Sequence, residues 1–160
     1  MNAEIRHNPG FAVTRCTLAG GEKMRAESGS MAATSAGVEI EAKVQGGLMK
    51  GLKRSVLGGE SLFMTTLTAP SGGGWVDVAA NLPGDAMVMP VGEELFLTRG
   101  AYLASDANVD IDTKWGGFKS IGGGEGFVME FTGPGVIHTQ TRNPDFLVTW
   151  LTEVLPFTRA

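Results

Sequence analysis

Apolar and polar residues alternate through much of this chain. In segment 38–44 (Val-Glu-Ile-Glu-Ala-Lys-Val) every second side chain is apolar, which is the period of a β-strand with one buried face. Segment 109–115 repeats the pattern, with Val109, Ile111 and Trp115 on the predicted inward face. Further strands are predicted at 12–18, 61–68, 75–79, 94–98, 127–132 and 136–141. About a dozen short strands between Gly- and Pro-rich turns predict an all-β sandwich or barrel.

Helical periodicity is confined to two places. Segment 48–57 is predicted to form one or two helical turns, which Gly51 weakens. Segment 144–155 carries an apolar stripe and ends before Pro156. It follows Asn143, a favourable N-cap, and starts at Pro144, whose missing N–H costs nothing at the first helical position. We expect this C-terminal helix to dock on the sheet or on a neighbouring subunit.

The two β-rich halves of the chain read as copies of one module. Glu39–Lys43 aligns with Asp110–Lys114, 71 positions later. The turn motif Gly58-Gly59-Glu60 aligns with Gly123-Gly124-Glu125, 65 positions later. The sequence therefore predicts an internally repeated single domain over residues 1–160. Module one spans about residues 11–80, module two about 86–142, and the helix follows at 144–155.

Composition places the chain among globular proteins without an obvious charged partner. Of its residues, 42% are hydrophobic and 19% charged, and the net charge is −4, so nucleic-acid binding is not favoured. The 24 glycines indicate many tight turns. No apolar run approaches the ~18 residues of a membrane helix, and the first residues lack a signal or presequence pattern. We therefore expect a cytoplasmic protein without an integral membrane segment.

Candidate chemistry is sparse. The histidines His7 and His138 are too few for the usual metal sites of β-barrel enzymes, so no metal or cofactor is predicted. The single cysteine, Cys16, lies in a predicted strand, where a thiol behaves as a small hydrophobe. Glu60 and Glu125 are interpreted as turn residues that bond loop N–H groups. The alternative is a carboxylate site of a hydrolase or isomerase. We expect no catalytic residue and no enzyme activity.

One basic cluster stands out. Lys50, Lys53 and Arg54 lie within five positions of each other, where they are either a solvated face or a contact for an anionic lipid, RNA or a protein partner. No aromatic residue is interleaved with them, which argues against RNA. The cluster is kept as a possible anion or partner contact.

Several ordered motifs resemble one family. Residues 46–54 (Gly-Gly-Leu-Met-Lys-Gly-Leu-Lys-Arg), with Gly58–Phe63, Arg99–Ala104 and Thr132–Gly135, resemble the altered-inheritance-of-mitochondria 24 family. The resemblance implies a fold like that of the tryptophan RNA-binding attenuation protein, a short double-stranded β-helix whose modules assemble side by side into rings. It implies a homo-oligomer, with a trimer favoured, and no established catalytic residue. Eukaryotic relatives are linked to mitochondrial inner-membrane organisation, a role not expected for a chain without a presequence.

The chain departs from the family pattern in length. Members of the family resemble three modules, whereas here Trp115–Lys119 runs directly into Ser120–Gly126. We interpret this as the loss of one module, with a junction near Lys119-Ser120. The predicted function is that of a non-enzymatic structural or scaffolding protein acting as a homo-oligomeric β ring. The alternative is a ligand- or RNA-binding module that uses inter-module grooves or the Lys50, Lys53 and Arg54 loop.

Overall fold

The computed structural model describes residues 1–44, 63–98, 100–114 and 128–155, and these form thirteen strands and one helix. In chain order they are β1 (Asn2–Arg6), β2 (Val13–Leu18), β3 (Lys23–Glu27), β4 (Met31–Thr34), β5 (Glu39–Val44), β6 (Phe63–Thr68), β7 (Gly74–Ala79), β8 (Ala86–Val91), β9 (Glu94–Thr98), β10 (Tyr102–Asp106), β11 (Asp110–Lys114), β12 (Val128–Thr132), β13 (Gly135–Gln140) and α3 (Pro144–Val154).

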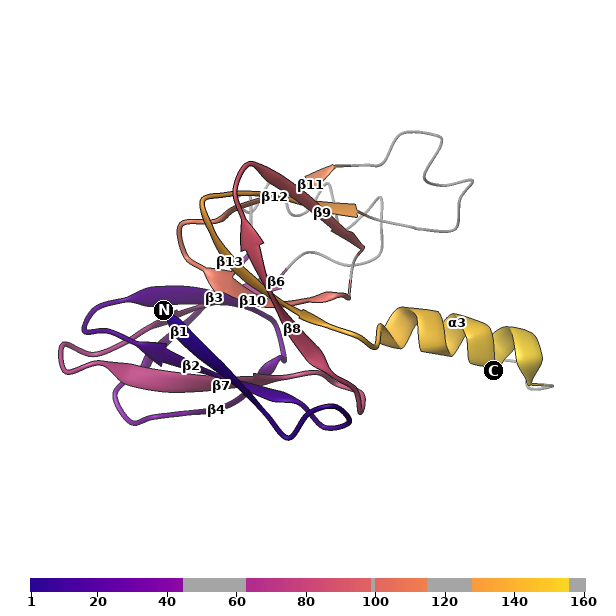
Figure 1. Cartoon of the computed structure of the whole chain (residues 1–160), viewed down its shortest axis with the longest axis horizontal. Helices are drawn as coiled ribbons and strands as arrows, with labels where there is room; N and C mark the ends of the chain where they lie inside the picture. The colour runs from indigo at the N-terminus through magenta and orange to yellow at the C-terminus, as the bar shows by residue number, and fades with distance from the viewer. Residues whose placement is uncertain (45–62, 99, 115–127, 156–160) are drawn as a thin grey trace.

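The strands form three antiparallel sheets (Figure 1). The first sheet has the order β1-β2-β7-β4, the central sheet β5-β6-β3-β10-β13-β8, and the third sheet β11-β12-β9. This arrangement confirms the predicted all-β fold with a C-terminal helix. The predicted helical turns at 48–57 lie outside the described residues.

The strands β2–β7 and β8–β13 pair in the same pattern. In the first half, β7 lies between β2 and β4, and β6 lies between β5 and β3. In the second half, β13 lies between β8 and β10, and β12 lies between β11 and β9. The ladders β4·β7 and β10·β13 even shift register at matching positions, between Met31 and Ala33 and between Tyr102 and Ala104. The two halves thus share one strand connectivity.

The central sheet joins the two halves. Its strands β5, β6 and β3 come from the first half and β10, β13 and β8 from the second. The contact is the antiparallel pair β3·β10, in which Ala26 faces Ala104 and Arg25 faces Ser105. Ser30 adds a side-chain bond across it, because its hydroxyl donates to the Leu103 carbonyl at 3.0 Å. A continuous hydrogen-bonded sheet therefore runs from one half into the other.

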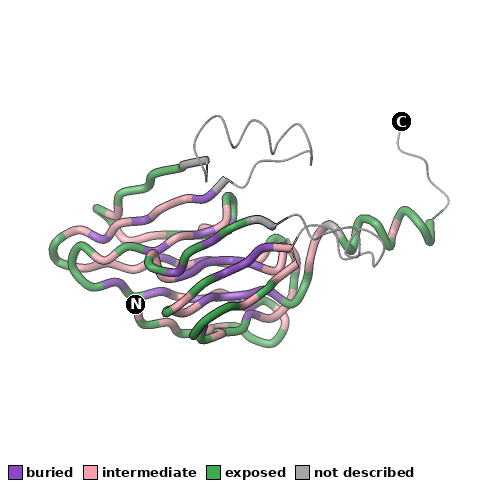
Figure 2. The backbone as a smooth tube through the Cα atoms, turned by 90° about the horizontal axis from the view of Figure 1, so that it is seen from above, coloured by how far each residue is buried: buried purple, intermediate pink, exposed green. Residues whose placement is uncertain are grey.

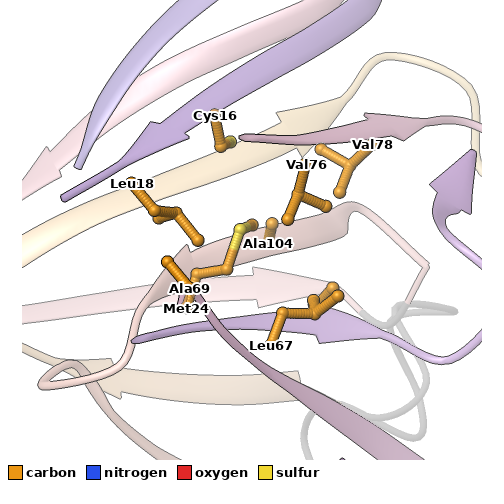
Figure 3. Packing of buried hydrophobic residues seen from close by; sticks show 9 residues of the cluster. Cys16, Leu18, Met24, Leu67, Ala69, Val76, Val78 and Ala104 are labelled. Atoms are coloured by element: carbon orange, nitrogen blue, oxygen red, sulfur yellow. The ribbon is translucent and has the colours of Figure 1, made fainter. Parts of the chain in front are cut away.

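The core is divided by the central sheet. One cluster packs β2 and β7 of the first sheet against the central sheet and contains Cys16, Met24, Leu67 and Val76 (Figure 3). A second packs the third sheet against the central sheet, with the Tyr102 ring stacked on Phe131 at 5.2 Å between centroids, and a small third cluster contains Ala12, Ala86 and Leu103. The buried positions follow the strands, whereas the helix is largely exposed (Figure 2).

Strands β5 and β11 occupy matching places in the two halves, and the predicted inward face is correct for β11 but not for β5. Val109 and Ile111 of the second half are buried, at 0% and 5% exposure. Ile40, which has the position of Ile111 in the first half, is 50% exposed, so the prediction that it faces the core is wrong. Both strands are outer strands of their sheets, so the difference lies in what covers them: Ile111 packs in a cluster with Tyr102 and Phe131, whereas no described segment covers Ile40 on β5.

The C-terminal helix begins where the sequence predicts. The Leu147 N–H donates to the Asn143 carbonyl at 3.2 Å, so Asn143 closes the first turn and Pro144 takes the first helical position. Beyond this turn α3 projects away from the sheets (Figure 1). Phe146, Trp150 and Val154 are about half exposed. The expectation that α3 docks on the sheet of its own chain is therefore wrong, and docking on a neighbouring subunit stays a prediction.

Candidate functional site

The residues that the sequence singled out for contacts lie outside the part of the chain that the structure describes. This holds for the basic cluster and for both turn motifs. They are Lys50, Lys53, Arg54, Gly58, Gly59, Glu60, Gly123, Gly124 and Glu125. Their roles as a partner contact and as module turns stay predictions.

His138 is enclosed in the protein. It lies in β13, between Ala104 of β10 and Val88 of β8, and has 0% exposure. Both ring nitrogens are buried without a hydrogen-bond partner among the described residues. Burial lowers the pKa of His138 because the charged imidazolium loses its hydration, although the carboxylate of Asp106 opposes this. The side chain is therefore neutral at physiological pH, and it is not accessible from solvent.

The side chain of Cys16 is also inaccessible to solvent. It has 0% exposure in the cluster between the first and central sheets. Burial raises the pKa of its thiol to about 12, since the thiolate would lie in an apolar environment. A protonated, enclosed thiol is a poor nucleophile, so Cys16 contributes packing.

The described residues form one notable hollow, at the base of α3. It is lined by Leu82, Pro83, Thr98, Ala101, Gln140, Thr141, Arg142, Asn143, Phe146, Leu147 and Trp150. Among these lining residues the only charge is that of Arg142, and there is no carboxylate, histidine or cysteine. The hollow offers an apolar wall with one cation, which suits contact with another apolar surface better than acid–base chemistry.

Close backbone approach fixes the position of this hollow. Gly100 has a φ of 80°, and a Cβ there would lie 2.6 Å from the Asn143 Oδ1 atom. The Gln140 side chain donates through Nε2 to the Gly100 carbonyl at 2.5 Å. The Thr141 hydroxyl accepts a bond from the Asp85 N–H at 2.8 Å. The start of α3 is thus held against two loops. The hollow could not be predicted from the sequence, because its walls come from three segments that lie far apart along the chain.

Within the described ranges, no group of three or more His, Cys, Asp or Glu side chains is arranged to hold a metal ion. No helix in the same ranges combines the length and apolar character needed to cross a bilayer.

Comparisons with known proteins place the chain in a family. The family described as mitochondrial biogenesis AIM24 matches residues 3–124. An uncharacterised protein of Streptococcus pyogenes serotype M6, M6_Spy0233, is 30% identical over 147 residues, covering 86% of this chain. The match covers 59% of the relative, so the chain spans about three fifths of its length.

A solved structure supports the fold. The crystal structure of protein SPYM3_0169 from Streptococcus pyogenes superposes with a TM-score of 0.60 and covers 96% of this chain and 99% of the other, at 24% identity. At this identity the likeness concerns the fold alone. The match over residues 3–124 spans most of the chain and agrees with the resemblance seen in its motifs. The chain therefore belongs to the AIM24 family.

Proposed function

We propose that this protein is a non-enzymatic structural or scaffolding protein that acts as a homo-oligomeric β ring of repeated modules. The observation that carries the proposal is the β3·β10 ladder, which joins two similarly connected halves into one six-stranded sheet. Modules that add to each other by sheet extension form arrays in which each unit contacts only its neighbours. Such arrays close into rings when the rotation per unit permits.

The exposed helix supports an interaction role. Phe146, Leu147, Trp150 and Val154 present apolar side chains to solvent, each at 39% exposure or more. Apolar residues gathered on one projecting element are typical of interaction sites. An assembly of several copies offers surfaces that cover this helix.

A non-enzymatic role is supported by the surroundings of the candidate nucleophile and base. Cys16 and His138 are both fully buried, and His138 lacks a polar partner among the described residues. A general base must reach the proton that it abstracts. The alternative function, ligand or RNA binding by the Lys50, Lys53 and Arg54 loop, has no further support from the described residues.

The experiment is the solution mass of the full chain. One chain has a mass of 16.8 kDa. Light scattering coupled to size-exclusion chromatography is expected to give a defined multiple of this value that does not change on dilution in the micromolar range. A mass of one chain at these concentrations would contradict the proposal. A broad distribution of masses that grows with concentration would contradict ring closure.

A further inference from the structure

The six outer strands of the three sheets differ in how they are protected. Outer strands that stay unpaired in solution usually carry charges or proline, which discourage pairing with another chain. Strand β1 carries Glu4 and Arg6, and β8 carries Pro90. Strands β5 and β11 each alternate two acidic residues with apolar ones and include a lysine. Four of the six outer strands thus have such protection.

The remaining two outer strands, β4 and β9, have no charge or proline at their central positions. Strand β4 reads Met-Ala-Ala-Thr and has neither charge nor proline. Strand β9 reads Glu-Leu-Phe-Leu-Thr, with a single charge at its first position and Phe96 at its centre 53% exposed. Among the described strands, β4 pairs with β7 alone and β9 with β12 alone. Neither strand thus carries a charge or proline at its centre that would discourage pairing, although β4 is short and shifts register beside β7.

By the shared connectivity of the two halves, β4 and β9 are the counterparts of β10 and β3, the two strands that join the halves. Strand β9 has the place in the second half that β3 has in the first, and β4 has the place in the first half that β10 has in the second. Since β3 pairs with β10, the matching partner of β9 is a β4. The β4 and β9 of one chain lie in its first and third sheets, on opposite sides of the central sheet (Figure 1). The β4 that fits must therefore come from a second copy.

The backbone groups at both edges point the right way. The Gly133 N–H donates to the Glu93 carbonyl at 3.1 Å, beside the Glu94–Thr132 pair. Backbone groups alternate along an antiparallel strand, so those of Phe96 face away from β12. In β4, the Ser35 N–H donates to the Trp75 carbonyl at 2.9 Å. The same alternation turns the backbone groups of Thr34 away from β7.

We propose that β9 of one copy pairs antiparallel with β4 of a second copy, with Phe96 opposite Thr34 and Leu97 opposite Ala33. The register is that of the existing ladder, where Arg25 lies opposite Ser105. This inference rests on the proposed oligomeric function and names its contact. It extends the sheet across the subunit boundary as β3·β10 extends it within the chain.

The difference in burial agrees with this assignment. In the paired ladder, Ala26, Ala104 and Ser105 are each 0% exposed. At the corresponding places in β4 and β9, Ala33 is exposed and Thr34 and Leu97 are only half-buried in the single chain. Pairing with a second copy removes this apolar area from water and satisfies two rows of backbone groups.

The test is a disulfide between two differently tagged chains, one carrying Thr34→Cys and the other Phe96→Cys. Directly opposed residues lie about 4.5–5.5 Å apart at Cα, within the range for a disulfide. After co-expression and mild oxidation, we expect a covalent heterodimer of the two tagged chains on a non-reducing gel. Neither variant alone is expected to cross-link. The buried Cys16 is common to all chains, and wild type measures its background.

The control pair combines Thr34→Cys with Glu94→Cys, which is displaced by two residues along β9. Diagonal neighbours lie about 7–8 Å apart, beyond disulfide reach, so we expect at least a tenfold lower yield, on the order of 10% of the matched pair. Equal yields from both pairs, or cross-linking of Phe96→Cys with itself, would overturn the register. An oligomeric mass without the 34–96 disulfide would overturn the edge pairing while leaving the proposed function intact. A mass of 16.8 kDa for wild type would overturn both.

Discussion

Ser105 of β10 lies directly opposite Arg25 of β3, where the two halves of the protein share a ladder. Tyr102 reinforces this contact from the same strand as Ser105. Its hydroxyl lies 3.0 Å from Ser105 Oγ and 3.3 Å from the Arg25 carbonyl oxygen. The ring is fully buried and stacks on Phe131. The contact between the halves is thus built from backbone pairing and from the side-chain hydrogen bonds of Ser30, Tyr102 and Arg25.

Removing the Tyr102 hydroxyl tests how much its hydrogen bonds at the β3·β10 contact contribute to the free energy of unfolding. Tyr102→Phe keeps the ring on Phe131 but leaves Ser105 Oγ and the Arg25 carbonyl with one partner fewer. We expect the free energy of unfolding to fall by about 1–2 kcal/mol, the cost of a lost buried hydrogen bond. Urea unfolding followed by far-UV circular dichroism measures it. A change within about 0.3 kcal/mol would show that the hydroxyl adds no stability.

The matched isoleucines of the two halves should respond differently to truncation. Ile111→Ala removes a side chain that is 5% exposed, so we expect a loss of about 2–5 kcal/mol from the cavity that it leaves. Ile40→Ala removes one that is 50% exposed in the single chain, and its loss should stay below about 1 kcal/mol. Both variants are compared by denaturant unfolding. Equal losses would contradict the burial difference between β5 and β11.

His138 should make the protein sensitive to mild acid. Its pKa in the folded state is lowered by burial, whereas in the unfolded state it is about 6.5. Below this value the unfolded chain binds a proton that the folded chain does not. Stability is therefore lost as the pH falls from about 6.5 toward the folded-state pKa, by at most about 1.4 kcal/mol per pH unit.

The pH effect is measured by unfolding wild type and His138→Leu between about pH 5 and 7. Subtracting the two profiles removes the contribution of other titrating groups. We expect the wild-type profile to fall more steeply toward acid than that of the variant. Parallel profiles would mean that His138 has the same pKa in the folded and unfolded states.

Cys16 should resist thiol reagents in the folded protein. It is fully buried, and its pKa is raised to about 12 by that burial. At about pH 8 we expect a chromogenic disulfide reagent to label the native chain only at the rate of its opening, and to label the unfolded chain at once. The measurement is absorbance against time, with and without guanidinium. Rapid stoichiometric labelling of the native chain would contradict the placement of Cys16.

A charge at the centre of β9 should weaken the assembly. Phe96→Lys places a cation on the strand that lacks protection, and we expect association to weaken by at least about tenfold. The control is Ile40→Lys on β5, an outer strand that already alternates charges and has a similarly exposed side chain. Sedimentation velocity compares the two variants with wild type. Equal behaviour of both variants would contradict a role for β9.

The local structure was largely readable from residue order. The sequence predicted β7 (Gly74–Ala79) and β13 (Gly135–Gln140) to within a residue or two, but it predicted no individual strand at the places of β1, β3, β4, β8 and β10. The Asn143-Pro144 pair predicted the start of α3 for a reason internal to the helix, namely its unsatisfied first N–H groups. The hollow at the base of α3 was missed, because its glycine contacts depend on chain segments that meet only after folding.

By itself, the sequence determined eight of the thirteen described strands, the start of the C-terminal helix, the all-β class and the family of this protein, since these depend on periodicity, turn residues and motif order. Tertiary structure alone decided that β3 meets β10, that β4 and β9 have one neighbour each among the described strands, and that Ile111 is buried while Ile40 is exposed. The physical reason is that strands pair through backbone groups common to all residues except proline. Which strands become neighbours therefore leaves little trace in side-chain pattern.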